Sequence, residues 1–302
     1  MDLLLFRSVW SGPDDLGALI AQTQAGGFNG IEGPIPKEKS RRQTFRDRLD
    51  EAGLAFIAEV ATGTDPEALD WWVPRRDRTA QQHLDDLRWT VEHAGEMGAR
   101  FVSTMCGYDG WSWEQNLFFF EQALGLEEEF GITISFETHR GRSLFNPWVT
   151  RDLLNRFPQI KLTCDFSHWC VVCERLLVDE QDIIERCALN AQHLHCRVGY
   201  AQHAQVSDPR APEFAVALTA HEHWWQLIWD AQAERSMSEV TMTPEFLWDG
   251  YLMTIPYTQA PVADLWEITV WMAQRERQQF ENWLHSGQIL IGQVSDPKTI
   301  HN

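Results

Sequence analysis

The sequence predicts an α/β fold in which eight parallel strands close into a single (β/α)8 barrel over residues 1–302. Short apolar, strand-like runs alternate with amphipathic helical stretches from one end of the chain to the other. Gly53, Gly98 and Gly131 each end a helical stretch and precede an apolar run. No linker, repeat or low-complexity segment divides the chain. A doubly wound open sheet is the alternative, but it would need a glycine-rich phosphate loop, and neither GxGxxG nor GxxxxGK(S/T) occurs.

The elements follow each other in the order that a barrel requires. The predicted strands are Leu3–Val9, Asn29–Glu32, Ala55–Val60, Phe101–Thr104, Thr133–Glu137, Lys161–Asp165, Gln192–Arg197 and Val240–Pro244. The predicted helices are Asp14–Ala25, Arg41–Ala52, Thr79–Met97, Trp113–Phe130, Val149–Arg156, Asp179–Ala188, Ala220–Ala233 and Val262–Trp283. The stretch Val198–Pro212 is the longest irregular one, and a long loop after a barrel strand is usually part of the active site.

Composition and charge narrow the class of partner. Hydrophobic residues make up 44% and charged residues 23% of the chain, which is typical of a globular protein. A net charge of −19 opposes binding to nucleic acid and to anionic membranes. No run approaches the roughly 18 apolar residues of a membrane span, and the start lacks the pattern of a signal peptide. Six cysteines without framework spacing favour a reducing, cytoplasmic location, and Cys170 and Cys173 form a lone CxxC that we interpret as ordinary thiols.

Four predicted strands each end in a residue that can bind a metal ion: Glu137, Asp165, His195 and Glu245. A carboxylate at the end of a buried strand is costly unless it is paired, hydrogen-bonded or bound to metal. In a parallel barrel these strand ends meet on one face. Three carboxylates and one imidazole suit Mn²⁺ best, with Mg²⁺, Co²⁺ or Zn²⁺ as alternatives. His193 has the same strand period as His195, but His195 lies nearer the strand end and is the preferred ligand.

The sequences around these residues resemble the xylose isomerase-like TIM barrel superfamily, which includes sugar phosphate isomerases and epimerases, related lyases and the endonuclease IV type of DNA repair enzyme. The motifs that carry the resemblance are F-E-T-H at 136–139, D-F-S-H-W at 165–169, H-x-R-V-G-Y at 195–200 and T-P-E-F at 243–246. The resemblance covers nearly the whole chain and implies that Glu137, Asp165, His195 and Glu245 bind one divalent ion. Epimerases of this kind often carry an acidic residue three positions after the histidine, where this chain has Val198.

Several further residues are candidates for substrate contacts. The resemblance implies that His168 and Arg197 face the substrate, and tryptophans in the loops after strands offer flat faces to sugar rings. The predicted substrate-binding residues are His168, Arg197, His139, Trp10 and Trp111. Glu32 and Glu59, at the ends of the second and third strands, are weaker candidates for contacts with substrate hydroxyls. His221 and His223 are predicted not to be ligands, because they open a helical stretch in which their side chains face apart.

The resulting hypothesis is a metal-dependent isomerase or epimerase of a sugar, keto-sugar or cyclitol. Glu137 or Glu245 would remove a proton next to a carbonyl, giving a metal-bound enediolate, and the other would return a proton from the opposite face. The same intermediate can expel a leaving group, so a lyase or dehydratase is the runner-up. A DNA repair endonuclease would need histidines at the ends of the second and fourth strands, which have none. A non-catalytic sugar-binding barrel is a further alternative, and a homo-oligomer is compatible with all of these.

Overall fold

The structure, a computed structural model, describes residues 1–65, 67–68, 70, 72–248 and 250–294; residues 66, 69, 71, 249 and 295–302 lie outside the described part. Eight parallel strands pair in sequence order, and β8 pairs with β1 to close the barrel, so the predicted fold class is confirmed. The strands are β1 (Asp2–Ser8), β2 (Gly30–Gly33), β3 (Ala55–Ala61), β4 (Val102–Met105), β5 (Ile134–Glu137), β6 (Lys161–Cys164), β7 (Ala191–His195) and β8 (Glu239–Thr243).

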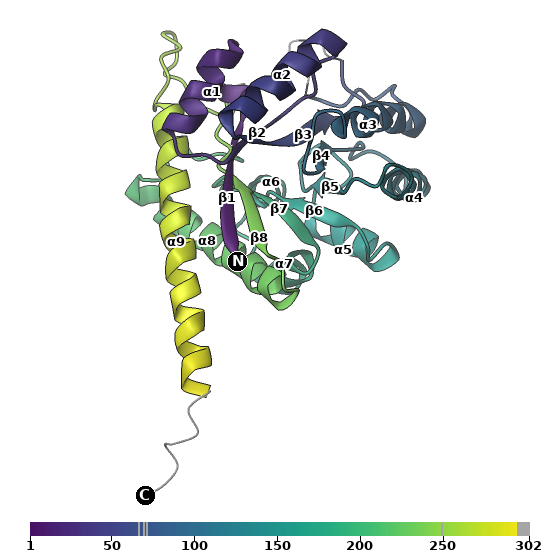
Figure 1. The fold of residues 1–302 in the computed structure, drawn as a ribbon. Helices are drawn as coiled ribbons and strands as arrows, with labels where there is room; N and C mark the ends of the chain where they lie inside the picture. The colour runs from purple at the N-terminus through teal and green to yellow at the C-terminus, as the bar shows by residue number, and fades with distance from the viewer. Residues whose placement is uncertain (66, 69, 71, 249, 295–302) are drawn as a thin grey trace, which may run out of the picture.

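Helices surround this barrel, and α9 runs along its outside and continues beyond its end (Figure 1). The α-helices are α1 (Leu16–Ala25), α2 (Lys39–Ala52), α3 (Ala80–Ala94), α4 (Trp113–Phe130), α5 (Pro147–Arg156), α6 (Ser167–Val172), α7 (Gln181–Ala188), α8 (Ala215–Glu234) and α9 (Leu265–Val294). Short 3₁₀ turns lie at η1 (Val9–Ser11), η2 (Val178–Glu180) and η3 (Pro212–Phe214). No helix in the described part of the chain is both long and apolar enough to cross a membrane.

Local sequence signals account for where the helices begin and end. Thr79 and Ser112 each start a helix with a capping box, in which the side chain and a glutamine three residues later satisfy each other's backbone amides. Gly53 and Gly131 end α2 and α4 with φ of 67° and 65°, the left-handed conformation that glycine adopts without strain. The helix α8 begins five residues earlier than predicted, so His221 lies inside it, buried, rather than at its start.

The barrel lumen is built in layers that change from apolar to charged along the strands. Phe6, Ile57 and Phe101 form an apolar cluster at the amino-terminal end of the strands. A layer of hydroxyls follows, in which Thr163 bonds both Ser103, at 3.0 Å, and Ser135, at 2.8 Å. Two residues further along the strands, the side chains that face the lumen are the acidic and histidine residues of the site, for example Glu137 beyond Ser135 on β5. The lower layers therefore give these charged groups a rigid base.

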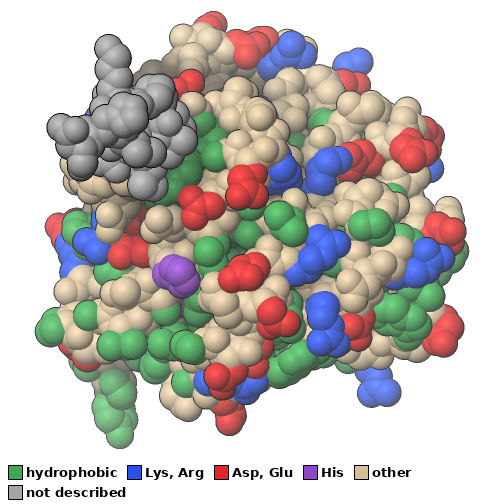
Figure 2. Space-filling model, turned by 90° about the horizontal axis from the view of Figure 1, so that it is seen from below, with side chains coloured by type: hydrophobic (Ala, Val, Ile, Leu, Met, Phe, Trp, Pro, Cys, Tyr) green, Lys and Arg blue, Asp and Glu red, His purple; other side chains and the backbone are tan. Residues whose placement is uncertain are grey.

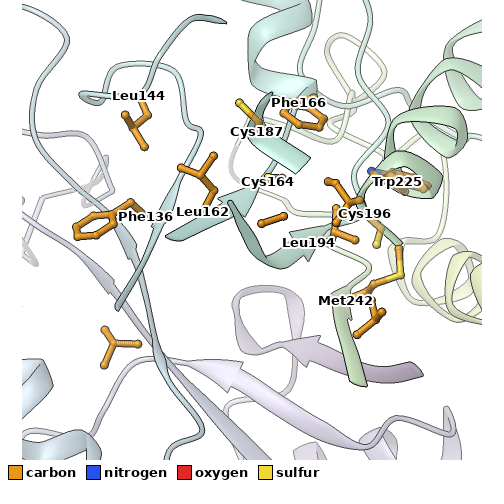
Figure 3. Close-up of a cluster of buried hydrophobic side chains, with 14 of the residues drawn as sticks. Phe136, Leu144, Leu162, Cys164, Phe166, Cys187, Leu194, Cys196, Trp225 and Met242 are labelled. Carbon is orange, nitrogen blue, oxygen red and sulfur yellow. The ribbon is translucent and has the colours of Figure 1, made fainter. Parts of the chain in front are cut away.

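The outward side chains of the strands form the main core against the helices. Figure 3 shows Phe136, Leu162, Leu194 and Met242, from β5 to β8, pointing away from the lumen toward the surrounding elements, with Trp225 of α8 among them. This packing fixes the backbone at the ends of β5 to β8, from which the candidate metal ligands project. On the molecular face seen in Figure 2, acidic and basic side chains are interspersed, so the net charge of −19 is not gathered into one acidic patch there.

Candidate metal centre

The four expected ligands meet at the carboxyl ends of their strands. Glu137 is the last residue of β5 and His195 the last of β7, while Asp165 and Glu245 follow β6 and β8 by one and two residues. Each side chain offers a ligand atom, and these atoms all lie within 4.8 Å of one another. All four residues are buried. Two ligands on opposite sides of one ion, each bonded at about 2.1–2.2 Å, would stand about 4.3 Å apart, so the spacing suits a single cation.

His195 is oriented so that one ring nitrogen faces this cluster and the other faces a supporting carboxylate. Its Nδ1 lies 3.1 Å from Glu245 Oε2 and 3.4 Å from Glu137 Oε1. Its Nε2 lies 3.1 Å from Glu32 Oε1. Metal-bound histidines commonly donate their second N–H to a carboxylate in this way, which fixes the tautomer and makes the ligating nitrogen more basic.

Glu32 is therefore a partner of histidines. Its Oε2 accepts from Thr243 Oγ1 at 2.5 Å and lies 3.2 Å from His193 Nε2. Glu32 is not among the residues that line the cavity above the site, and a contact between Glu32 and substrate hydroxyls stays a prediction. The second nitrogen of His193 lies 2.8 Å from Thr241 Oγ1, in the hydroxyl layer below. His193 thus supports Glu32, and His195 is the histidine that joins the four-residue cluster.

Arg197 supplies positive charge beside the same carboxylates. Its Nη2 donates to Asp165 Oδ2 at 2.9 Å and to Glu245 Oε2 at 2.5 Å. Burial lowers the pKa of Arg197, but the carboxylates of Glu245 and Asp165 outweigh it and raise that pKa above its usual value, so the guanidinium stays charged. Its Nη1 is buried without a hydrogen-bond partner, and the residue lines the cavity above the site. Arg197 lies two residues beyond β7, in a loop, whereas the sequence had predicted that it ends the strand.

Burial and charge set the protonation of the remaining groups. Burial raises the pKa of Glu137 to about 7, against the lowering effect of His195. Burial also raises the pKa of Glu245, but Arg197 and His195 outweigh it and lower that pKa overall. For His195 burial lowers the pKa, and the carboxylates of Glu245, Glu32 and Glu137 raise it well above its usual range. The cluster thus holds several carboxylates that require nearby positive charge.

The donor set and one unpartnered oxygen fit a divalent ion. Glu137 Oε2 is buried without a hydrogen-bond partner among the described residues, and His195 Nδ1 faces the carboxylates of Glu137 and Glu245. Buried polar atoms of this kind are rare unless a ligand or water satisfies them. Three carboxylates with one imidazole form a hard, oxygen-rich set that suits Mn²⁺ or Mg²⁺. Glu137, Asp165, His195 and Glu245 are thus the residues that would hold the ion.

A small cavity of about 30 Å³ lies directly over this cluster. Three of the predicted substrate-binding residues line it: Arg197, His139 and Trp10. Tyr251 lies across the cavity; its ring centroid is 4.5 Å from the Arg197 guanidinium, and its hydroxyl is 3.4 Å from His139 Nε2. The full lining comprises Trp10, Trp72, Met105, Glu137, His139, Arg197, Glu245, Leu247 and Tyr251.

Two other predicted substrate residues do not line this cavity. Trp111 packs against His83, with ring centroids 4.7 Å apart, and against Phe119, and so belongs to the packing around α3 and α4. His168 is fully buried; its Nε2 lies 3.3 Å from Arg197 Nη2, and its ring centroid lies 3.7 Å from that of His139. For His168 and for Trp111 a direct substrate contact stays a prediction.

Sequence reasoning missed several residues of the lining. Leu247 and Tyr251 come from the loop between β8 and α9, whereas Trp72, from the loop after β3, is one of the loop tryptophans that were expected near the pocket. The loop from 244 to 264 is longer than Val198–Pro212, the stretch taken as the longest. The length of this loop, which directly follows a strand with a candidate ligand at its end, is the signal that could have identified its lining residues.

The fold and this cluster define a class of protein, an eight-stranded parallel barrel with carboxylates and an imidazole gathered at the carboxyl ends of its strands. The sequence model of the xylose isomerase-like TIM barrel family matches residues 20–224, more than half of the chain, and the chain belongs to that family. The resemblance drawn from the four motifs is therefore confirmed. No curated protein matches the sequence.

Solved structures with the same fold include enzymes of different activities. A D-psicose 3-epimerase from Clostridium cellulolyticum H10, solved with D-tagatose, is 13% identical, with a TM-score of 0.57 over 91% of this chain and 98% of that one. A 3-keto-D-glucoside 4-epimerase from E. coli is 11% identical, with a TM-score of 0.54 over 82% and 93%. A probable 3-DHS dehydratase from Bacillus anthracis is 14% identical, with a TM-score of 0.55 over 88% and 96%. At these identities the likeness shows the fold alone.

Proposed function

We propose that this protein is a divalent-metal-dependent isomerase or epimerase of a sugar, keto-sugar or cyclitol, and that it works by proton abstraction next to a carbonyl. The observation that carries the proposal is the four-residue cluster at the barrel mouth, in which Glu137 and Glu245 both line the cavity. Mn²⁺ is the ion we expect there. When bound, such an ion polarises a carbonyl and makes the neighbouring C–H more acidic.

The two glutamates approach the cavity from different strands, and their surroundings differ. Glu137 ends β5 and lines the cavity, where its carboxylate can take a proton from a substrate carbon. Glu245 follows β8 and is held by Arg197. A substrate lying between them has one carboxylate on each side, so a proton removed on one side can be replaced on the other. Such a pair supports epimerisation or isomerisation.

Arg197 and His139 complete the proposed substrate site. Arg197 has a free Nη1 on the cavity and can donate to a carbonyl or hydroxyl oxygen. His139 Nδ1 lies 2.6 Å from the carbonyl of Arg140, which holds the ring edge toward Tyr251 and the cavity. Burial, with neighbouring arginines, lowers the pKa of His139 well below its usual range, so this ring is neutral. These groups orient a polyhydroxylated ligand without adding further negative charge.

Solvent deuterium tests this proposal. Incubation of the Mn²⁺-loaded protein with a panel of ketoses in D₂O should place deuterium at the carbon next to the carbonyl, and EDTA should abolish it. Glu137→Gln and Glu245→Gln should each slow exchange by about 10²–10⁴-fold, the usual contribution of a positioned base. Glu92→Gln, a change of an exposed glutamate on α3, serves as the matched control. Turnover that survives both active-site substitutions would refute proton abstraction by these residues.

The same cluster also suits a lyase or dehydratase acting on a keto-sugar or keto-glycoside. Abstraction of the same proton can be followed by loss of a group on the next carbon, and the barrel from Bacillus anthracis is described as a probable dehydratase. Product analysis separates the two: an isomer or epimer retains the mass of the substrate, whereas elimination releases water or an alcohol. A product of lower mass that still requires Glu137 would favour the lyase.

A further inference from the structure

A second and much larger cavity opens beside the candidate metal centre. It has a volume of about 520 Å³ and lies where β1, β2 and β3 end, with α3 as its outer wall. Trp10, in the turn after β1, lines both this groove and the small cavity over the metal ligands. We call it the Trp10 groove; its lining is Trp10, Pro34, Ile35, Lys37, Glu59, Val60, Ala61, Thr64, Arg78, Asp86, Trp89 and Thr90. Trp10 is the partition between the two spaces.

The two volumes differ in what they can hold. About 30 Å³ is enough for a water molecule or a metal ion but not for a sugar ring. The Trp10 groove falls within the range of cavities that bind small molecules. Any substrate that reaches the metal ligands must therefore displace part of the cavity wall, and displacement of Trp10 would join the two spaces.

Glu59 is the observation that points to a ligand in the groove. This residue, near the end of β3, is only 2% exposed. Its Oε2 accepts from Trp10 Nε1 at 2.6 Å, but its Oε1 is buried without any hydrogen-bond partner. A buried carboxyl oxygen is rarely left unpaired, and a hydroxyl from a ligand in the groove would satisfy it. Displacement of Trp10 would free the second oxygen as well.

The rest of the lining offers both donors and acceptors on apolar walls. Lys37 Nζ lies 3.5 Å from the ring centroid of Trp89, and Arg78 forms no ion pair with any residue that the structure describes. Asp86 Oδ2 accepts from the backbone N–H of Gly63 at 2.8 Å and keeps other lone pairs free. The carboxyl groups of Glu59 and Asp86 and the basic side chains of Lys37 and Arg78 offer acceptors and donors that suit a ring with several hydroxyls.

We propose that the Trp10 groove binds the second ring of a glycoside whose ketose ring lies over the candidate metal centre. This inference rests on the proposed function, which it narrows from sugars in general to disaccharide-like substrates. Glu59 and Asp86 accept hydrogen bonds from the hydroxyls of the second ring, and Lys37 and Arg78 donate to them.

Ketose disaccharides test the groove. D-Fructose is compared with turanose, maltulose, isomaltulose and lactulose, which all carry a fructose unit joined to a second ring. Fructose 6-phosphate is included to test whether the groove binds an anionic group instead of a second ring. Binding is followed by ligand-observed NMR, and turnover by deuterium exchange. Thr64→Trp fills the groove from a half-buried position, and Thr44→Trp places the same residue on the exposed outside of α2 as the control. Thermal unfolding of both variants shows whether they fold.

The expected result is that one or more disaccharides bind more tightly than D-fructose, and that Thr64→Trp reduces this advantage by about tenfold or more, whereas Thr44→Trp retains it. The proposal is overturned if no disaccharide exceeds D-fructose, if Thr64→Trp leaves the advantage intact, or if only fructose 6-phosphate gains from the groove. Disaccharide binding that Thr64→Trp abolishes, without deuterium exchange in any ketose, would support the groove and refute the proposed chemistry.

Discussion

Replacement of Glu32 by glutamine should weaken metal binding, although Glu32 is not expected to touch the ion. The carboxylate faces His195 Nε2 at 3.1 Å and His193 Nε2 at 3.2 Å, and it accepts from Thr243 Oγ1 at 2.5 Å. It therefore sets the orientation and basicity of the one imidazole in the four-residue cluster. An amide in its place has no charge and only one acceptor oxygen, so it cannot accept at both positions as the carboxylate can.

Loss of such a supporting carboxylate typically lowers metal affinity about 10–100-fold, equivalent to about 1.4–2.7 kcal/mol. Calorimetric titration of the metal-free protein with Mn²⁺ measures this directly. Glu59→Gln is the matched control, because Glu59 is also a buried glutamate at a neighbouring strand end but hydrogen-bonds Trp10 rather than a histidine. Wild-type affinity in Glu32→Gln, or an equal loss in Glu59→Gln, would refute the assigned role of Glu32.

Three further predictions follow from the same geometry. Glu245→Gln should weaken Mn²⁺ binding, since a charged oxygen ligand is lost, and elemental analysis after dialysis measures the retained ion. His168→Ala should keep the ion but slow turnover, because His168 contacts Arg197; loss of the ion would show that it is a ligand instead. Glu276 is fully buried, and burial together with Glu222 raises its pKa well above the usual value. The contribution of Glu276 to the stability of the fold is therefore present at acidic pH and declines as the pH rises toward and through that pKa. Glu276→Gln should therefore raise the melting temperature more at neutral than at acidic pH, and an equal gain at both would contradict the assignment.

Most of the barrel was predictable because short stretches of sequence determine where its strands and helices begin and end. The predicted strands agree with the observed ones within two residues at each end, since buried parallel strands read as short apolar runs and glycines mark where helices end. The gathering of Glu137, Asp165, His195 and Glu245 followed from one rule, that parallel strands end on the same face.

The parts that sequence did not predict depend on distances between elements. Nothing in the sequence around Arg197 indicates that its guanidinium reaches Asp165 and Glu245, because this contact requires the relative positions of β6, β7 and β8. Leu247 and Tyr251 reach the cavity from an irregular loop, in which no periodicity fixes the direction of a side chain. The pairing of Glu32 with His193 and His195 was not predicted either, because it depends on the relative positions of β2 and β7.

The central claim is that four side chains of this barrel hold one divalent ion, and anomalous X-ray diffraction at the manganese edge tests it most directly. Crystals grown with Mn²⁺ should show one strong anomalous peak bonded to Glu137, Asp165, Glu245 and His195, with Nδ1 as the ligating atom of the histidine. The wild-type protein should show this peak, and Glu245→Gln should show it weakened or lost. Absence of a peak between these residues, or a peak bonded to His193 instead of His195, would contradict the account.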